Sequence, residues 1–212
     1  MIGLTFVTRV WRRLAVGDAT PVDALLDTGF VAIDLETTGL DARRDAVVAL
    51  AAIPFERGIA RPGLVTLVHP GRPIPPQSTA IHGIDDAAVG SAPSLAEVLP
   101  RFDALCARRF VVGHDVAFDV AVLAHGRTAP AGLAPRLALD TRRLSRASGF
   151  RDTRLEELAA RLGVSVVGRH SADGDARMAG EVLVALLPIL RRGGVRTIGD
   201  ILRLQGGAPL HD

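Results

Sequence analysis

The chain has 212 residues, 48% of them hydrophobic, and a formal net charge of +2 at pH 7. This length and composition predict one compact domain with a full core, and no apolar run reaches the roughly 20 residues that a transmembrane helix needs. The apolar N-terminal residues precede Arg9, Arg12 and Arg13, the reverse of the order in a secretory signal, and the single cysteine, Cys106, cannot form an internal disulfide. We therefore expect a cytoplasmic protein without a membrane partner, and the small net charge does not by itself indicate nucleic acid.

The first third of the chain predicts a helix followed by three strands. Residues 2–16 can form an amphipathic helix. Apolar runs over 30–35, 46–55 and 64–69 predict three adjacent strands, because each run is short and turn-forming residues separate it from the next. The proline-rich segment 70–76 that follows predicts a loop.

The rest of the chain alternates helices with short strands. Ser94 can cap a helix that ends near Cys106, and Thr153 can cap another that Gly163 terminates. The other predicted elements are strands over 110–112 and 137–140 and helices over 116–125, 154–162 and 172–190. Three strands followed by alternating helices and strands predict an α/β fold in which helices flank a mixed sheet.

Two carboxylates interrupt the apolar run that starts at Phe30. Residues two apart in a strand point to the same face, so Asp34 and Glu36 should leave the sheet on one side while Ile33 and Leu35 pack on the other. Two like charges this close repel and are costly to desolvate, and a divalent cation between them relieves both effects. Carboxylate oxygens are the ligands that Mg²⁺ and Mn²⁺ prefer. The pair therefore predicts a metal site, and the alternative is an edge strand whose acids face solvent.

Three further polar residues lie at or near the starts of predicted helices. Asp119 interrupts an apolar first turn and needs a partner there, which the helix N-terminus partly supplies. Asp175 opens the last predicted helix, and His170 lies in the loop before it. Each position alone has an ordinary structural explanation, because acids stabilise helix starts and a lone histidine is more often structural than catalytic.

Taken in order, the motifs resemble those of the DnaQ-like family of 3′→5′ exonucleases, the DEDDh class, which includes the proofreading ε subunit of bacterial DNA polymerase III. The order is Asp-x-Glu on a strand, His-Asp-x-x-Phe-Asp at a helix start, and His-x-Ala-x-x-Asp-Ala at the last helix. Residues 28–187 carry the resemblance, which also includes the sequences Ile81-His82-Gly83-Ile84 and Asp140-Thr141. The five residues that give the class its name have counterparts in Asp34, Glu36, Asp119, His170 and Asp175.

The resemblance implies a ribonuclease H-like fold and hydrolysis of phosphodiester bonds with two divalent cations, Mg²⁺ or Mn²⁺. In this scheme Asp34 would bridge both ions, and Glu36 and Asp175 would each hold one. Asp119 would act directly or through a bound water. His170 would be the general base on the attacking water.

The resemblance also implies a pocket for the 3′-terminal nucleotide of a single strand, of DNA rather than RNA, which leaves as a nucleoside 5′-monophosphate. The residues expected to contact this nucleotide are Thr37, Gly39, Gln77, His82 and Phe118. A polymerase or a repair protein is the implied protein partner. Two positions depart from the family pattern: Asp115 stands where Asn is usual, and Ser171 stands where Arg is common.

We expect three segments: an N-terminal helical extension over 1–27, the exonuclease domain over 28–190, and a short C-terminal tail over 191–212. The tail is shorter than the segment by which the ε subunit binds its polymerase, so we expect no stable place in a replicase. Two alternatives stay open: an RNA-trimming exonuclease of the same fold, distinguished through the 2′-hydroxyl, and a non-catalytic module that binds nucleic acid. The complete set of five site residues favours catalysis, because a non-catalytic module would be free to lose one.

Overall fold

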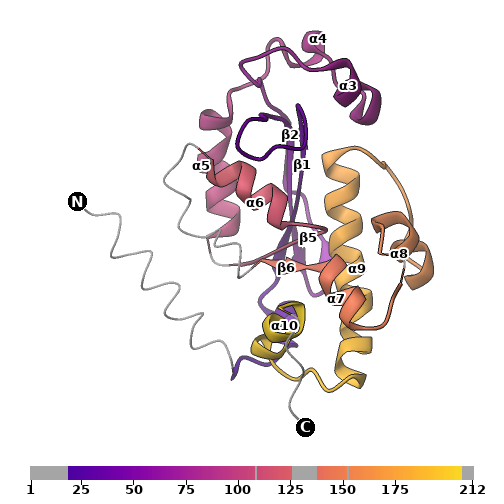
Figure 1. The fold of residues 1–212 in the computed structure, drawn as a ribbon. Helices are drawn as coiled ribbons and strands as arrows, with labels where there is room; N and C mark the ends of the chain where they lie inside the picture. Colours follow the sequence, from indigo (N-terminus) through magenta and orange to yellow (C-terminus); the bar gives the residue numbers. More distant parts are fainter. Residues whose placement is uncertain (1–18, 108, 126–137, 152, 207–212) are drawn as a thin grey trace.

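The computed structural model describes residues 19–107, 109–125, 138–151 and 153–206. Within these ranges the chain forms a six-stranded mixed sheet with helices on both faces (Figure 1), which confirms the predicted α/β class. The helix predicted over 2–16 lies outside the described residues. Across the described ranges, no helix is both long and apolar enough to cross a membrane, and the cytoplasmic location stays a prediction.

The sheet is built outward from β1, with the strand order β3-β2-β1-β5-β6 and with β4 also paired to β2. The strands are β1 Phe30–Thr37, β2 Val47–Glu56, β3 Ile59–Ala60, β4 Leu64–Leu67, β5 Phe110–Gly113 and β6 Leu139–Asp140. β2 is antiparallel to β1, β3 and β4, whereas β5 is parallel to β1 and β6. β1 therefore has a partner on each side, and its near-continuous apolar run is that of a central strand covered on both faces.

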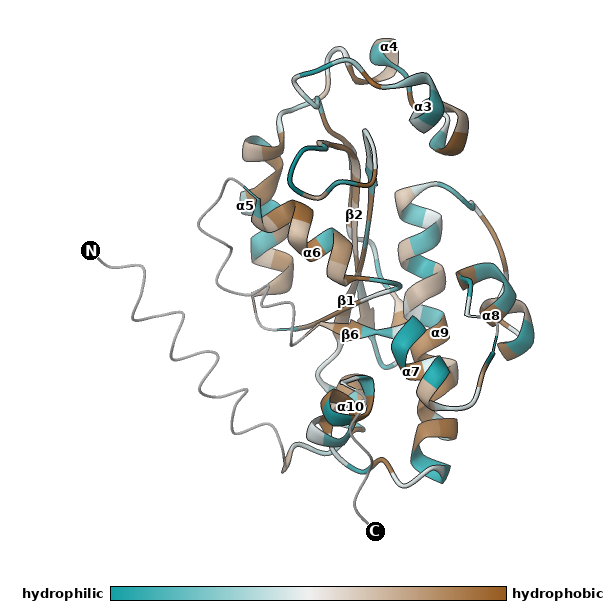
Figure 2. Cartoon of the chain, in the orientation of Figure 1, coloured by the Kyte–Doolittle hydropathy of each residue, from teal (hydrophilic) through white to brown (hydrophobic). Residues whose placement is uncertain are grey.

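Helices cover both faces of this sheet. Their bounds are α2 Ala24–Asp27, α3 Pro76–His82, α4 Asp86–Val89, α5 Leu95–Cys106, α6 Ala117–Ala124, α7 Thr141–Ala147, α8 Leu155–Leu162, α9 Ala172–Arg192 and α10 Ile198–Gln205. In Figure 1, α5 and α6 lie on one side of the sheet, and α7, α8 and α9 lie on the other. Figure 2 shows hydrophilic and hydrophobic residues mixed on α5, α9 and α10, the pattern of helices that turn one side toward a core.

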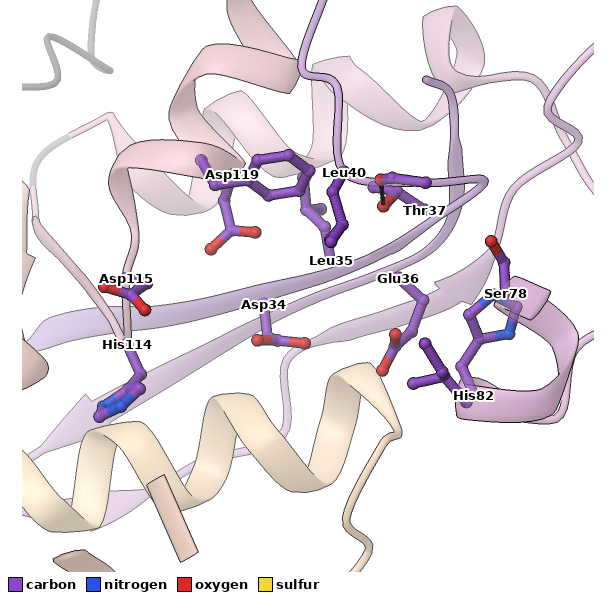
Figure 3. A pocket seen from close by; sticks show the side chains of 13 residues that line it. Asp34, Leu35, Glu36, Thr37, Leu40, Ser78, His82, His114, Asp115 and Asp119 are labelled. Atoms are coloured by element: carbon purple, nitrogen blue, oxygen red, sulfur yellow. Dashed lines mark hydrogen bonds between the residues drawn. The ribbon is translucent and has the colours of Figure 1, made fainter. Parts of the chain in front are cut away.

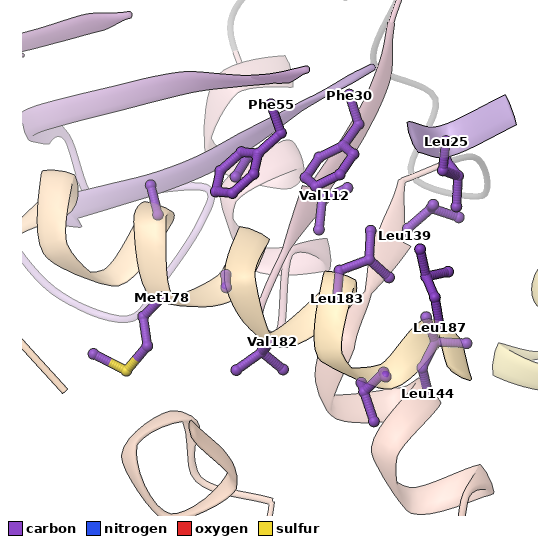
Figure 4. Close-up of a cluster of buried hydrophobic side chains, with 14 of the residues drawn as sticks. Leu25, Phe30, Phe55, Val112, Leu139, Leu144, Met178, Val182, Leu183 and Leu187 are labelled. Atoms are coloured by element: carbon purple, nitrogen blue, oxygen red, sulfur yellow. The ribbon is translucent and has the colours of Figure 1, made fainter. Parts of the chain in front are cut away.

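The two faces of the sheet have separate hydrophobic cores. On the α9 side, the rings of Phe30 and Phe55 stack with their centroids 4.8 Å apart, and Leu183 and Leu187 of α9 belong to the same buried cluster (Figure 4). Gly180 allows α9 to come this close, because a Cβ built there would lie 2.2 Å from the Phe55 ring. The long helix that carries Asp175 is thereby held against β1 and β2.

The strands and long helices agree with the sequence-based expectations, but the connections contain more structure than expected. The turn region 57–62 includes β3, and short helices α3, α4 and α7 were not predicted. α3 begins with Pro76, a residue favoured at the first position of a helix, and ends at Gly83 in the left-handed conformation. The Asp140 side chain caps α7 by accepting hydrogen bonds from two backbone N–H groups.

The prediction that Thr153 caps the helix over 154–162 is wrong. α8 begins at Leu155, and its N-cap, Arg154, makes no side-chain capping hydrogen bond. Thr153 is buried and serves a different contact, because its carbonyl oxygen accepts a hydrogen bond from His114 Nε2 at 2.7 Å. A tertiary contact therefore uses the residue that the local pattern assigned to a cap.

The segment predicted as a C-terminal tail contains α10, which a capping box between Thr197 and Asp200 starts. Ile198 and Ile201 are buried in the core on the α9 side. The Gln205 side chain reaches the last residue of β6, where its Oε1 accepts a hydrogen bond from the Asp140 N–H at 3.1 Å. Residues 198–205 thus pack as part of the folded unit, while the division into three segments stays a prediction.

Candidate active site

The first two acids project from the central strand toward α9. Asp34 and Glu36 alternate with Ile33 and Leu35, whose side chains are buried in the core on the α5 and α6 side, as predicted. Figure 3 shows the two carboxylates on one side of β1, above the first turns of α9. Their cross-strand partners on β2, Ala51 and Ala49, are small, so the space over the acids is not filled from the neighbouring strand.

Asp175 approaches the same point from the first turn of α9. Ser171 caps this helix, its side-chain oxygen accepting from the Gly174 N–H at 3.2 Å. Gly174 allows the preceding loop to fold against the helix, because a Cβ there would meet the Gly168 carbonyl oxygen at 2.1 Å. Carboxylate oxygens of Asp34, Glu36 and Asp175 all lie within 4.8 Å of one another, which makes them one acidic cluster.

Asp119 comes from the first turn of α6, where it is buried with 5% of its surface exposed. Its carboxylate faces Asp34 in Figure 3, although it does not belong to the group within 4.8 Å. Its charge still acts on the cluster, because it is one of the causes that raise the pKa of Asp34.

Burial and mutual repulsion both raise the pKa values of these acids. Desolvation first, and then the charges of Asp119, Asp175 and Glu36, raise the pKa of Asp34 well above its usual range. Burial, followed by the charge of Asp175, raises the pKa of Glu36 to about 7. Burial likewise raises the pKa of Asp119 and of Asp175. The cluster is therefore short of positive charge, and its oxygen donors fit a divalent cation.

Arg169 is the cation that the protein itself brings to the cluster, and the sequence motifs did not indicate it. Its guanidinium lies 3.4 Å from both carboxylate oxygens of Asp175 and 3.3 Å from Glu156 of α8. It thereby links the loop before α9 to α8. The neighbouring His170 is exposed, has a left-handed φ of 57°, and donates its backbone N–H to Asp175 Oδ2 at 3.2 Å.

A cavity of about 380 Å³ opens beside the acids, between the carboxyl end of β1 and α3. Its lining includes Asp34, Leu35, Glu36, Thr37, Gly39, Leu40, Ser78, Ile81, His82, His114, Asp115, Phe118 and Asp119. The cavity thus brings together four of the five residues predicted to contact a nucleotide. The fifth, Gln77, is exposed on α3 and does not line the cavity.

The turn that follows β1 forms one wall of this cavity, and hydrogen bonds hold it in place. The Thr37 hydroxyl donates to the Gly39 carbonyl oxygen at 2.6 Å, and the Thr38 hydroxyl donates to Asp45 at 2.9 Å. Ser78 of α3 closes the other side by donating to the Thr38 carbonyl oxygen at 2.8 Å. This turn presents Leu40, which is 90% exposed, at the mouth of the cavity.

Ser78 and Ile81 were missed as lining residues because no helix was predicted after the loop over 70–76. Proline at the first position and glycine after the last are the signals of a short helix, and they were present in the sequence. A helix places Ser78 and Ile81, three positions apart, on one face. That face is the one toward the cavity.

At the other end of the site, His114 and Asp115 follow β5. Burial lowers the pKa of His114, whose Nδ1 lies 2.9 Å from the Thr141 hydroxyl. Asp115, the residue that departs from the family's usual Asn, has a left-handed φ of 59° and pairs with Arg142 of α7. The negative charge that Asp115 adds to the site is therefore paired with the guanidinium of Arg142.

Comparison with known sequences identifies the family. The RNase T exonuclease family model matches residues 31–183. A DNA polymerase III subunit epsilon from Aquifex aeolicus is 34% identical over 189 residues, which cover 87% of this chain and 94% of that protein. A DNA polymerase III subunit epsilon-like protein from Rhodobacter capsulatus is 38% identical over 190 residues, or 86% of this chain, but the chain spans only 27% of that protein's length.

Solved structures agree with this match. Exonuclease X in complex with 5′ overhanging duplex DNA has a TM-score of 0.66 at 25% identity, covering 84% of this chain and 99% of that one. E. coli exonuclease I in complex with a dT13 oligonucleotide has a TM-score of 0.67 at 18% identity, covering 78% and 42%, a likeness that shows the ribonuclease H-like fold alone. From the family match, the sequence identities and the shared fold, the chain belongs to the DnaQ-like, RNase T family of exonucleases and is a nuclease hydrolase.

Proposed function

We propose that the chain is a metal-dependent 3′→5′ exonuclease that removes nucleoside 5′-monophosphates one at a time from single-stranded DNA. One observation carries the proposal: carboxylates of Asp34, Glu36 and Asp175 meet within 4.8 Å beside a cavity of about 380 Å³. Such a volume suits a small ligand of the size of a nucleotide. Asp34 and Glu36 line this cavity together with Thr37 and Gly39 of the turn after β1.

Asp34, Glu36 and Asp175, with Asp119 beside them, would hold two divalent cations, Mg²⁺ or Mn²⁺. Bound cations of this kind supply Lewis acidity toward the phosphate and a more acidic water. The acids supply the oxygen donors, and their raised pKa values reflect burial first and then the repulsion between their negative charges.

His170 would be the general base that takes a proton from the attacking water. Its ring is exposed beside the acids, in the loop that precedes α9. The hydrogen bond from its backbone N–H to Asp175 keeps this loop next to the cluster, so the ring is presented from a fixed backbone. A base of this kind contributes roughly 10²–10⁴-fold to the rate.

The cavity next to the acids supports cleavage from a strand end, and the 3′ end is the one that the family resemblance implies. A terminal nucleotide that enters past Asp34 would meet the turn formed by Thr37 and Gly39, which would obstruct a continuing strand. Phe118 and His82 offer ring faces on which an unpaired base can stack. DNA is favoured over RNA because the neighbouring exonuclease X was solved with DNA and the relatives are named as DNA polymerase subunits, which also makes a DNA polymerase the first protein partner to test.

The test is digestion of uniformly labelled linear single-stranded DNA, circular single-stranded DNA and RNA, each with Mg²⁺, Mn²⁺ or EDTA. We expect mononucleotide products from linear DNA with either metal, no cleavage in EDTA, and an intact circle. Prompt cleavage of the circle or mainly longer products would contradict the proposal. Faster digestion of RNA than of DNA would favour the RNA-trimming alternative, and inactivity on every substrate would favour a binding module.

A further inference from the structure

A second cavity, of about 280 Å³, lies next to the acidic cluster on the side of α7 and α8. Asp34, His114 and Asp115 line both this cavity and the one beside Thr37, so the two cavities meet at Asp34. Asp175 also lines the second cavity. A strand whose terminal nucleotide occupied the first cavity, with its scissile phosphate at the acids, would have the second cavity beside its next nucleotide.

The two cavities differ in the number of cationic side chains that line them. Arg142, Arg154 and Arg169 line the second cavity, whereas among the described residues no arginine lines the first. A base and a sugar are uncharged, but each further nucleotide of a strand adds one phosphate charge, which lysine or arginine must neutralise. Arginine is the better of the two for this purpose because its planar guanidinium binds phosphate oxygens in pairs.

The three arginines are not equally placed to receive a phosphate. Arg169 is held between Asp175 and Glu156, at 3.4 and 3.3 Å. The Arg154 side chain is 62% exposed at the rim and pairs with Glu157 at 3.3 Å. Arg142 lines the same cavity from α7.

Two contacts fix the direction of the Arg142 side chain. Its NH1 group contacts the Asp115 carboxylate, and its Nε donates to the Thr153 hydroxyl at 3.3 Å. The Asp115 backbone is itself fixed, because its N–H donates to Asp140 Oδ1 at 3.2 Å and its φ is left-handed, a conformation that Asp tolerates better than most residues.

We propose that the second cavity is a phosphate subsite for the nucleotide upstream of the scissile bond, with Arg142 as its principal donor and Arg154 at its rim. Asp115 holds the guanidinium of Arg142 in place when no strand is bound and competes with the phosphate for it. This explains why an additional acid is tolerated at position 115, next to a cluster that already repels anions. The inference rests on the proposed function, since it takes the strand direction from it.

The test compares two substrates that differ only upstream of the scissile bond. The p-nitrophenyl ester of thymidine 5′-monophosphate has the terminal nucleotide and the scissile phosphodiester but no upstream phosphate, whereas a single-stranded oligothymidylate has both. The measured quantity is kcat/KM for the oligonucleotide divided by kcat/KM for the ester. Arg142→Gln should lower this ratio about tenfold or more, mainly through KM, because a hydrogen bond between charged groups is lost.

Three further variants separate this loss from a general disturbance of the site. Asp115→Asn should raise the ratio, because Arg142 is released from its competitor. The double variant Asp115→Asn/Arg142→Gln should show the low ratio of Arg142→Gln, although no unpaired Asp115 remains in it. Arg101→Gln, an exposed arginine of α5 on the opposite face of the sheet, should show the wild-type ratio.

A binding measurement keeps the test independent of hydrolysis. Fluorescence anisotropy of a 5′-labelled oligothymidylate with Ca²⁺ in place of Mg²⁺ should show weaker binding by Arg142→Gln, with a salt dependence reduced by about 0.7 in the slope of log K against log salt. Hydrolysis of neither substrate by the wild-type chain would contradict the proposed function, and the binding arm would then decide the subsite alone. Equal loss on both substrates, or unchanged ratio and unchanged salt slope, would overturn the subsite.

Discussion

At the scale of single residues, the acidic cluster places like charges where solvent screens them poorly. Asp119 and Asp175 are buried, and the pKa of Asp34 is raised first by burial and then by its acidic neighbours. An arrangement of this kind lowers stability unless a cation binds to it. Its energetic cost is the expected mark of a site selected for chemistry rather than for stability.

Asp34→Asn should reduce hydrolysis about a thousandfold or more, because a metal interaction of about 4 kcal/mol in the transition state corresponds to that factor. The variant should melt at the same or a higher temperature than the wild type in EDTA, since one repelling charge is removed. The measurements are single-turnover kinetics and thermal melting. Asp173→Asn is the matched control, because Asp173 lies on the same turn as Asp175 but pairs outward with Arg177. Near-normal turnover by Asp34→Asn would refute the role of this residue.

The pKa of Glu36 predicts how metal-free stability depends on pH. Its value in the folded protein is about 7, above the value of about 4.3 for an unperturbed glutamate, so the folded state holds the proton more tightly. This contribution to stability is therefore complete below pH 4 or so and is lost as the pH rises to about 7. In EDTA, the melting temperature should fall over this window, and Glu36→Gln should flatten the fall. Melting curves from pH 5 to 8 check it, and identical slopes for both proteins would contradict it.

At the scale of elements, α9 both packs in the core and carries a residue of the acidic cluster. Its first turn carries Asp175, and further along the same helix Gly180 contacts the Phe55 ring of β2. The position of the carboxylate relative to β1 therefore depends on how closely the helix approaches the sheet. A change at this contact should alter both stability and the distance from Asp175 to Asp34.

Gly180→Ala should destabilise the protein by about 1–3 kcal/mol, because the added methyl group overlaps the ring of Phe55 and the core must shift. It should also weaken metal binding, since α9 carries Asp175 away from β1. Urea unfolding and Mg²⁺-dependent shifts in melting temperature measure the two effects. Gly90→Ala is the control, because Gly90 has a helical φ of −57° and a Cβ there meets nothing closer than 3.5 Å. Equal stability of the two variants would show that α9 has room to move.

At the scale of the whole molecule, the segments before β1 and after α9 pack against each other. The Val22 N–H donates to the Arg196 carbonyl oxygen at 2.8 Å, and the Ile198 N–H donates to the Thr20 carbonyl oxygen at 2.9 Å. Leu25 and Ile201 are completely buried in the same core. These two segments close the end of the core that lies away from the acids.

Ile201→Ala should destabilise the protein by about 2–5 kcal/mol, the range for removing a large aliphatic side chain from a core. Hydrolysis by the folded fraction should be little changed, because Ile201 lines neither of the two cavities that meet at Asp34. Urea unfolding checks stability, and Leu204→Ala, on the partly exposed side of α10, should cost less. Deleting residues 1–27 should also lower stability, since it removes Leu25. A melting temperature unaffected by Ile201→Ala would show that α10 is dispensable.

Much of the site follows from local patterns in the sequence. The two-residue period of a strand places Asp34 and Glu36 on one face whatever surrounds them, and the helix starts at Asp119 and Asp175 are readable from their neighbours. The α/β class follows in the same way from the order of apolar runs. Each of these features depends on residues only a few positions apart.

The rest depends on contacts between residues far apart in the chain, which no local period encodes. Only the folded structure brings Asp175 within 4.8 Å of Asp34 and Glu36, sets Arg142 against Asp115, and turns Thr153 from an expected cap into an acceptor for His114. The packing of α10 was missed for the same reason, because the surface that its apolar side covers is formed by residues far away in the chain. Local propensity determines the helices and strands of this protein, and the burial of their apolar faces against one another determines which side chains come into contact.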